Sequence, residues 1–302
     1  MNNIIKEYDE FNNLVYIADY YSGKGYRTKK EIKKESIEEK NIEKYIKSLR
    51  GSRKRQNNKF GILINKSLNF NKNYNDNNIF KILIIFYFVF LIVCIFNFYK
   101  QREILHFVFS TQKNYHSSEF GIGMICFLLG VILIHEFSHI LISRISNILV
   151  LKLGFKLKYY IFPIFYVKAM PTSHRMKKVN IAFVGLVADL LLVNIYFYLY
   201  FFYNDSMYFL VALKLQFLLL LFNYNILLPT DFTQALLNYI HKENLRKEMF
   251  KEIKNLIFKK QKIKNYLTKK RIILYSTYIL LFVVFWLYVF INIIYTLIYN
   301  LL

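Results

Sequence analysis

The sequence predicts an all-α, multi-span membrane protein with about five transmembrane helices. The 302 residues are 55% hydrophobic and 19% aromatic, although 20% of them are charged, and the mean hydropathy is positive. A soluble domain with that share of charged residues rarely reaches a positive mean hydropathy. The apolar residues also lie in long runs with the basic residues between them, and this arrangement is typical of a membrane protein.

Five apolar runs of about 18 residues or more are long enough to cross a bilayer. They cover residues 82–99, 120–142, 179–203, 207–228 and 272–300. Lys and Arg number 18 in residues 1–81, 3 in 100–119, 8 in 143–178, none in 204–206 and 12 in 229–271. This alternation predicts a cytoplasmic N-terminus and an external C-terminus. Because topology accounts for the net charge of +23, we expect no nucleic-acid partner.

Residues 1–78 are expected to form a small cytoplasmic basic region made of helices. The sequences TKKE from Thr28 and SIEE from Ser36 both fit a capping box, and an amphipathic stripe follows them up to Gly51. Residues 52–78 are rich in Asn, Lys and Arg and are predicted to be a linker. The start of the chain has no short apolar core followed by a small-residue cleavage site, so we expect no removable signal peptide.

Three ionisable residues lie inside the second apolar run, where His135, Glu136 and His139 form the pattern H-E-x-x-H. Each such group at membrane depth costs about 2.5–3.5 kcal/mol on insertion scales, so it needs a partner and a function. On a helix the two imidazoles share one face and can bind one metal ion, Zn²⁺ by the usual use of this motif. Glu136 is then placed to take a proton from an activated water. The alternative is two buried histidines that bond only to neighbouring helices.

Catalytic zinc usually has three protein ligands and one open position. The best remaining donor is Asp231, at the inner end of the fourth apolar run. The topology permits this choice, because the histidine pair and Asp231 both fall in the cytoplasmic halves of their helices. The alternative is that Asp231, with Gln234 three residues later, caps a helix that follows Pro229.

These motifs resemble the site-2 protease family of intramembrane zinc metalloproteases. In that family three spans form the core, with H-E-x-x-H on the first and a Pro-bearing Asp motif at the end of the third. Alignment on Asp231 places Asn223 at the family asparagine, whereas Ile226 and Phe232 stand where the family has proline and glycine. The segment NYNILLPTDF looks closer to the branch that is associated with peptide maturation.

The resemblance extends to the middle span, where the family has A-G-P-x-x-N and this chain has VGLVAD. Gly185 is kept, Leu186 replaces the proline and Asp189 replaces the asparagine. A glycine in a membrane helix allows a neighbouring helix to approach closely. Asp189 needs a partner in the membrane. It either hydrogen-bonds near the site, competes with Asp231 as third ligand, or makes a structural pair elsewhere.

Two further segments carry weaker resemblances. In the family, the segment between the first two core spans is extended or forms a hairpin that lines the cleft and can pair with substrate backbone. Here residues 152–178 occupy that place, and interface packing of their Tyr and Phe is the alternative. The N-terminal region resembles the winged-helix elements that recognise leader peptides, which implies a leader peptide as partner. A basic tail near anionic lipid is the alternative.

The resemblance implies a zinc endopeptidase that hydrolyses a membrane-embedded or membrane-tethered peptide, in peptide maturation or in processing of a regulator. The expected segments are 1–78 (basic region and linker), 79–119 (first transmembrane helix and external loop), 120–237 (three-span metalloprotease core), 238–271 (basic interfacial helix) and 272–302 (last transmembrane helix). The bias toward Asn, Ile, Lys and Tyr suggests a bacterial cell membrane. The rival hypotheses are a non-catalytic peptide-export or immunity component and a membrane-tethered nucleic-acid binder.

Overall fold

The structure is a computed structural model, and only part of the chain can be described in it. The described residues are 4–8, 14–19, 24–27, 59–68, 74–109, 116–158, 162–204, 206–225, 228 and 230–240, with the single helical positions 277, 280, 283, 284 and 287. The capping boxes from Thr28 and Ser36, most of the predicted interfacial helix and most of the last predicted span therefore lie outside the described residues.

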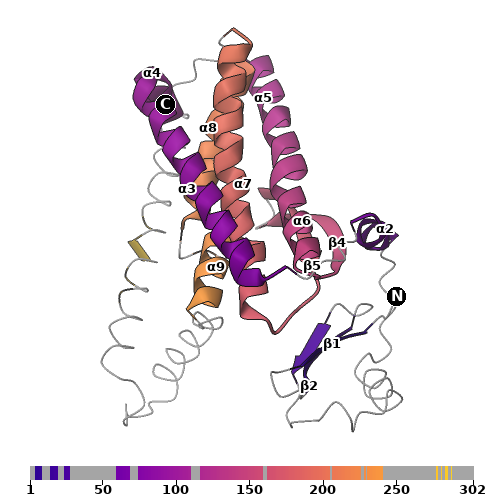
Figure 1. The fold of residues 1–302 in the computed structure, drawn as a ribbon. Coiled ribbons are helices and arrows are strands. Elements are labelled where there is room, and N and C mark those ends of the chain that lie inside the picture. Colours follow the sequence, from indigo (N-terminus) through magenta and orange to yellow (C-terminus); the bar gives the residue numbers. More distant parts are fainter. Residues whose placement is uncertain are drawn as a thin grey trace.

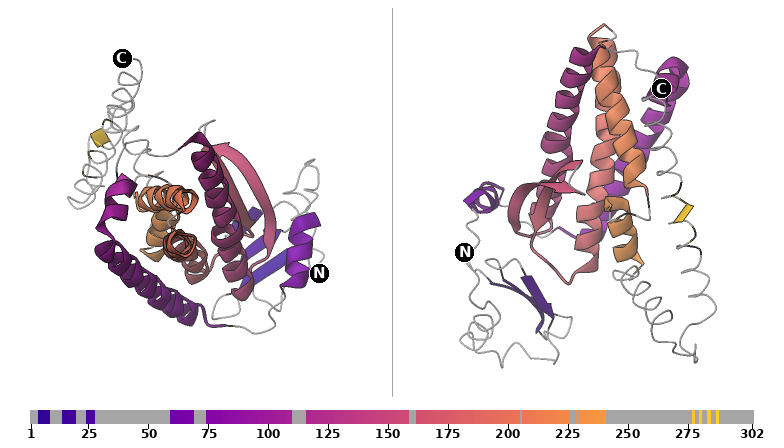
Figure 2. Two further views of the ribbon diagram at one scale, coloured as in Figure 1. Left: turned by 90° about the horizontal axis from the view of Figure 1, so that it is seen from above. Right: turned by 180° about the vertical axis from the view of Figure 1, so that it is seen from behind.

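Four apolar helices run side by side and form the body of the protein (Figures 1 and 2). They are α3 (Asp76–Lys100), the continuous helix made of α5 (Ser117–Gly130), η2 (Val131–Glu136) and α6 (Phe137–Ile145), then α7 (Arg175–Phe202) and α8 (Met207–Asn223). The first three are long and apolar enough to cross a membrane, and α8 is shorter, with 17 residues. The predicted fourth span is wrong at its end, because α8 stops at Asn223 and not at Leu228.

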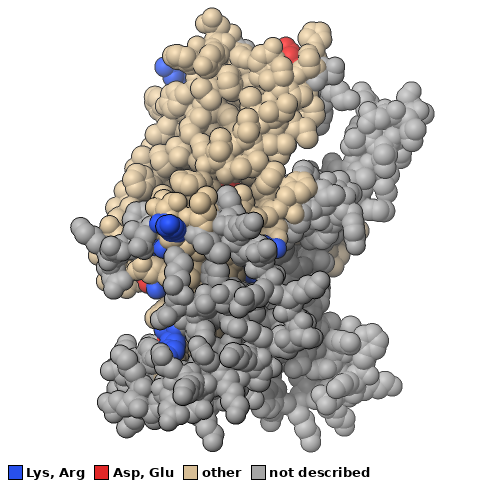
Figure 3. All heavy atoms as spheres, turned by 90° about the vertical axis from the view of Figure 1, so that its right-hand side faces the viewer, with Lys and Arg blue, Asp and Glu red and all other residues tan. Residues whose placement is uncertain are grey.

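Helix α7 is the most buried of the three long apolar helices. In the most apolar stretch of 18 residues in α7, 72% of the residues are buried, whereas in the corresponding stretch of α3 only 17% are buried. The exposed side chains of α3 are large and apolar, from Ile82 to Tyr99. Figure 3 shows few charged side chains over the helical part and more Lys and Arg below it. Such a broad apolar surface is expected to face lipid, which supports a membrane-embedded protein.

Small residues set how closely the helices pack. A Cβ atom on Gly123 of α5 would lie 2.7 Å from the backbone oxygen of Tyr208 and from Cβ of Val211 in α8. The helices α5 and α8 can therefore approach closely only because this position is glycine.

The segment that was expected to be an external loop contains a short helix, α4 (Arg102–Phe109), whose Ile104 and Val108 join the core between α7 and α8.

Strands make the all-α expectation wrong in two places. At the N-terminus β1 (Ile4–Tyr8), β2 (Leu14–Asp19) and β3 (Lys24–Arg27) form an antiparallel sheet in the order β1-β2-β3, where we expected helices. These segments are short and rich in Ile, Val and Tyr, which favour strands. Between α6 and α7, β4 (Val150–Lys158) and β5 (Phe162–Ala169) form an antiparallel hairpin. The hairpin agrees with the extended or hairpin segment that the resemblance implied there.

A helix also lies inside the predicted linker, which is therefore wrong in part. The helix α2 (Lys59–Ser67) is fixed to the start of β4 by Asn65, which is 1% exposed. The Asn65 amide donates to the Val150 carbonyl and its oxygen accepts from the Val150 N–H, at 2.9 Å each. The guanidinium of Arg144 in α6 donates to the carbonyls of Asn65 and Leu68. Thus α2 supports the hairpin beside the bundle.

Replacement of Asn65 by Ala is expected to destabilise the protein, because both backbone groups of Val150 lose their partner in a buried place. Each buried polar group without a partner costs about 1–3 kcal/mol. With two such groups, the free energy of unfolding in detergent should fall by about 2 kcal/mol or more, while Lys66→Ala, an exposed neighbour in α2, should leave it within about 0.5 kcal/mol of the wild type. Equal stabilities for the two variants would contradict the role of Asn65.

Candidate metal centre

His135 and Glu136 lie at the end of a π-helical turn, η2, which interrupts the long helix between α5 and α6. The hydroxyl of Tyr196 in α7 donates to the carbonyl of Cys126 at 2.7 Å. It can approach because residue 130 is glycine, where a Cβ atom would collide with the Tyr196 hydroxyl. Single π turns inside α-helices are frequent at functional sites. Here the turn contains the first two residues of the motif, and α7 packs against it.

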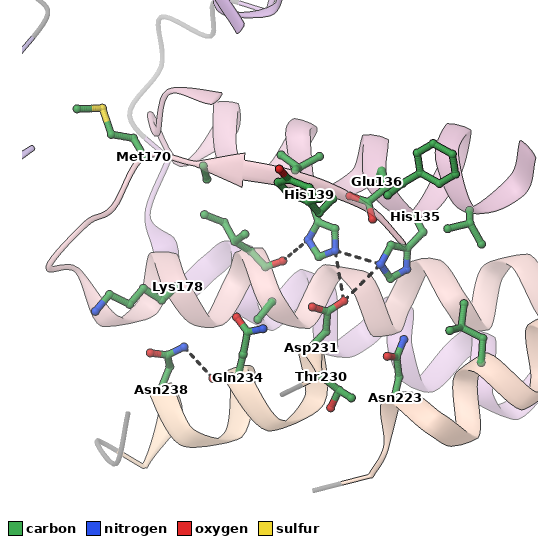
Figure 4. Close-up of a pocket in the computed structure, with 18 of the residues that line it drawn as sticks. His135, Glu136, His139, Met170, Lys178, Asn223, Thr230, Asp231, Gln234 and Asn238 are labelled. Carbon is green, nitrogen blue, oxygen red and sulfur yellow. Dashed lines mark hydrogen bonds and ion pairs between the residues drawn. The ribbon is translucent and has the colours of Figure 1, made fainter. Parts of the chain in front are cut away.

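The structure brings together the three residues that were predicted to bind metal (Figure 4). Nε2 of His135 and Nε2 of His139 are 3.2 Å apart, and each lies 3.3 Å from Oδ2 of Asp231. Among the described residues these side chains form the group of His, Cys, Asp or Glu that can hold a metal ion. The donors come from the η2–α6 segment and from the separate short helix α9 (Asp231–Tyr239).

The capping alternative for Asp231 is wrong. Thr230 is the N-cap of α9, and its hydroxyl accepts from the backbone N–H of Thr233. Asp231 is the first residue of α9, and its carboxylate points at the two imidazoles (Figure 4). An ionised carboxylate is the form that binds a cation.

Hydrogen bonds on the far side of each ring orient the two histidines. Nδ1 of His135 bonds to Oδ1 of Asp189 at 2.9 Å, and Nδ1 of His139 bonds to the backbone oxygen of Ile181 at 2.7 Å. Because a carboxylate and a carbonyl accept hydrogen bonds, the Nδ1 atoms carry the protons and both Nε2 atoms present lone pairs toward Asp231. Partners of this kind commonly fix metal-binding histidines. Asp189 therefore hydrogen-bonds beside the site and is not one of the three converging donors.

Asp189 also connects the middle helix to α8. The Gln216 amide donates to its Oδ1 at 3.0 Å, and the Asn223 amide donates to its Oδ2 at 2.5 Å. Asn223 was predicted as a supporting residue, whereas Gln216 was missed. A signal was present, because Gln216 is a polar residue inside the run LKLQFLLLL, seven residues before Asn223 and so on the same face of the helix.

Gly185 allows the cluster to form. A Cβ atom at this position would collide with Oδ2 of Asp231 and would lie 3.0 Å from both Cε1 and Nε2 of His139. The backbone of α7 therefore lies directly against the converging donor atoms. This explains why a small residue is required in the middle helix, as the sequence indicated.

The cluster opens into a cavity of about 610 Å³ between β5, α7 and α9. Glu136, which is 6% exposed, lines this cavity together with Val167 of β5. On one side of the cluster lies an apolar end, lined by Phe127, Leu128, Val131, Leu219 and Phe222. On the other side lies a polar end, lined by Tyr16, Thr172, Lys178, Gln234 and Asn238.

Comparison with known proteins adds no assignment. The chain matches no protein-family model, and neither the curated proteins nor the solved structures searched contain a match. Of the positions that depart from the family motifs, Ile226 lies outside the described residues. Leu186 is buried in α7, and the ring of Phe232 packs 5.4 Å from that of Tyr224. Any functional argument must therefore start from the geometry of the site.

Gly185→Ala is expected to weaken metal binding, because the added methyl group displaces Asp231 or His139 from the cluster. The affinity for Zn²⁺ or Co²⁺, measured by titration of the purified protein, should fall about tenfold or more. Gly121→Ala is the matched control, since a Cβ atom there meets nothing within 4 Å. Unchanged affinity in Gly185→Ala would show that the donors do not meet beside α7.

Carboxylate variants separate the donor from the orienting residue. Asp231→Ala should reduce bound metal to a trace, because it removes one of three ligands. Asp189→Asn should lower the affinity by about 10–100-fold, as is usual for a residue that orients a ligand. Both values can be obtained by titration with Zn²⁺ in competition with a chelator. The reverse order of effects would make Asp189 the third ligand.

Proposed function

We propose that the protein is an intramembrane zinc metalloprotease of the site-2 protease type. The observation that carries this proposal is that two imidazoles and one carboxylate converge on one point, with Glu136 beside them in the same cavity. The proposal also draws on the sequence resemblance, which covers residues 120–237. It assigns metal binding to His135, His139 and Asp231, and catalysis to Glu136.

The donor set fits zinc. Two imidazole nitrogens and one carboxylate oxygen are common ligands of catalytic zinc, and they leave a fourth position open. That position would face the cavity, where Glu136 lies. When bound, zinc supplies a Lewis acid that polarises a substrate carbonyl and makes water acidic enough to lose a proton near neutral pH. The Nδ1 partners of both histidines hold the rings in the tautomer that such binding needs.

Glu136 moves the proton in the proposed reaction. Its carboxylate takes a proton from the attacking water and later gives it to the nitrogen of the leaving amine, so that the C–N bond breaks and no charge remains on the product amine. Val167 of β5 lines the same cavity. Because the Glu136 side chain is largely screened from bulk solvent, few other groups compete for this proton.

The proposed substrate is a peptide that is embedded in the membrane or tethered to it. The apolar end of the cavity is lined by side chains of α5, η2 and α8, the helices with lipid-facing surfaces. A helical peptide must unwind before its carbonyl can be attacked, and it can regain hydrogen bonds by pairing with an edge strand. The strand β5 borders the cavity and is suited to this pairing. Maturation of a small secreted peptide fits such a reaction.

The membrane topology belongs to the same proposal. Five spans and a cytoplasmic N-terminus are supported by the distribution of Lys and Arg along the chain, and a bacterial cell membrane by the bias toward Asn, Ile, Lys and Tyr. A leader peptide as partner of the N-terminal region is supported by the sequence resemblance alone. Under this topology the metal centre lies near the cytoplasmic face of the bilayer.

A second candidate is a non-catalytic component for peptide export or immunity that keeps the fold and the metal. The replacements at Leu186 and Phe232 favour it, because the family residues at these positions are missing. Glu136 argues against it, since a purely structural metal site has no need of a buried carboxylate beside its ligands.

Glu136→Gln tests the proposal. This variant should keep bound zinc but lose cleavage of a membrane-tethered peptide encoded by a neighbouring gene, by about 100-fold or more, because general acid–base catalysis supplies at least that factor. Glu103→Gln, which changes an exposed glutamate of α4, is the matched control and should cleave like the wild type. Zinc is measured by elemental analysis and cleavage by mass spectrometry.

Two outcomes would overturn the proposal. Full cleavage by Glu136→Gln would remove this carboxylate from the mechanism. A wild-type protein that binds zinc but cleaves none of the candidate peptides would favour the non-catalytic component.

A further inference from the structure

The polar end of the cavity extends about 10 Å from the metal cluster. Lys178 lies seven residues before Gly185 on the same face of α7, and Asn238 lies seven residues after Asp231 on the same face of α9. Seven residues of α-helix span about 10 Å. Figure 4 shows Lys178, Asn238 and Met170 on the same side of the cluster, away from Asn223. A peptide that leaves the cluster along β5 must pass these residues.

The N-terminal sheet is docked at this polar end. The Glu7 carboxylate of β1 accepts hydrogen bonds from the Thr172 hydroxyl at 2.5 Å and from the Ser173 backbone N–H at 2.7 Å, and also from the Ser173 hydroxyl. We call this set of bonds the Glu7 contact. Thr172 and Ser173 lie between β5 and α7, so the contact attaches the sheet to the segment that closes the cavity wall.

The Glu7 contact fixes the position of Tyr16. In the β1–β2 pairing Glu7 stands directly opposite Tyr16, so both side chains project from the same face of the sheet. Tyr16 lines the cavity and packs against the cluster formed by Ile148, Leu151 and Met170. A side chain of this size at the cavity wall restricts the space beyond Met170.

We propose that Tyr16 is a specificity-determining residue that closes the polar end and limits how far a bound peptide extends beyond the cleaved bond. Val167 lines the cavity with Glu136 and lies three positions before Met170, which packs with Tyr16. An extended substrate paired with β5 therefore has room for about three residues, at about 3.3 Å each, before it meets the ring. Glu7 acts as a positioning residue through Tyr16. This inference rests on the proposed protease function.

The inference defines a class of substrate. A peptide whose polar segment ends within about three residues of the cleaved bond fits the closed cavity. A longer polar segment fits only after the sheet has moved, which requires the Glu7 contact to break. The protein is thus suited to cutting close to the polar terminus of a membrane peptide, and a long polar segment on that side is disfavoured.

Substrates of graded length test the limit. Two membrane peptides that share the cleaved bond are compared, one with three polar residues beyond it and one with eight. The wild type should prefer the short one. Tyr16→Ala and Glu7→Ala should each raise the long-to-short ratio of kcat/KM by about tenfold or more, as expected when a steric barrier is removed. Tyr16→Phe keeps the ring and should keep the preference. Tyr74→Ala, an exposed tyrosine before α3, is the matched control.

A second readout does not depend on cleavage. A water-soluble chelator such as EDTA should remove zinc faster from Tyr16→Ala than from the wild type, while the equilibrium affinity for zinc stays the same. Equal removal rates together with an unchanged length preference in Tyr16→Ala would overturn this inference and leave the protease function standing. If the wild type neither binds zinc nor cleaves, the proposed function fails and this inference fails with it.

Discussion

The buried carboxylate of Asp189 is the group on which the rest of the site depends. It is fully buried in α7, where an unpaired charge would cost several kcal/mol, and its oxygens receive hydrogen bonds from His135, Gln216 and Asn223. These partners come from η2 and α8, so one side chain ties three helices together at the level of the converging donors. The orientation of His135, and hence the direction of its Nε2 lone pair, follows from that network.

Close packing at two glycines also positions the donor residues. The glycine at position 185 lets Asp231 and His139 lie against the α7 backbone, and the glycine at position 130 admits the Tyr196 hydroxyl next to the π turn. Both positions place α7 at the centre of the arrangement, in keeping with its high burial. The third donor comes from α9, which is only nine residues long. Thr230 caps this helix, so the Asp231 carboxylate is not used as the cap and points toward the two imidazoles.

The sequence was most informative where ionisable residues interrupt apolar runs. His135, His139 and Asp189 stand out in that setting, because each must have a partner, and the i, i+4 spacing alone places both imidazoles on one face. Topology permitted Asp231 as the third donor, but the choice between donor and helix cap needed the position of Thr230. The N-terminal strands were missed although their Ile, Val and Tyr favour strands. The attachment of this sheet is a different matter, because the contacts of Glu7 with Thr172 and Ser173 join residues about 165 positions apart. Local pattern carries no trace of such contacts.

The separation of the donors along the chain has a consequence for biosynthesis. The histidine pair is present once residue 139 has been made, whereas Asp231 lies 92 residues later and opens a helix of its own. A nascent chain therefore has only two of the three converging donors while α7 and α8 are being made. The ribosome must add the whole of that stretch before the last carboxylate can reach the pair, so the three donors cannot meet until the chain has been made at least as far as residue 231.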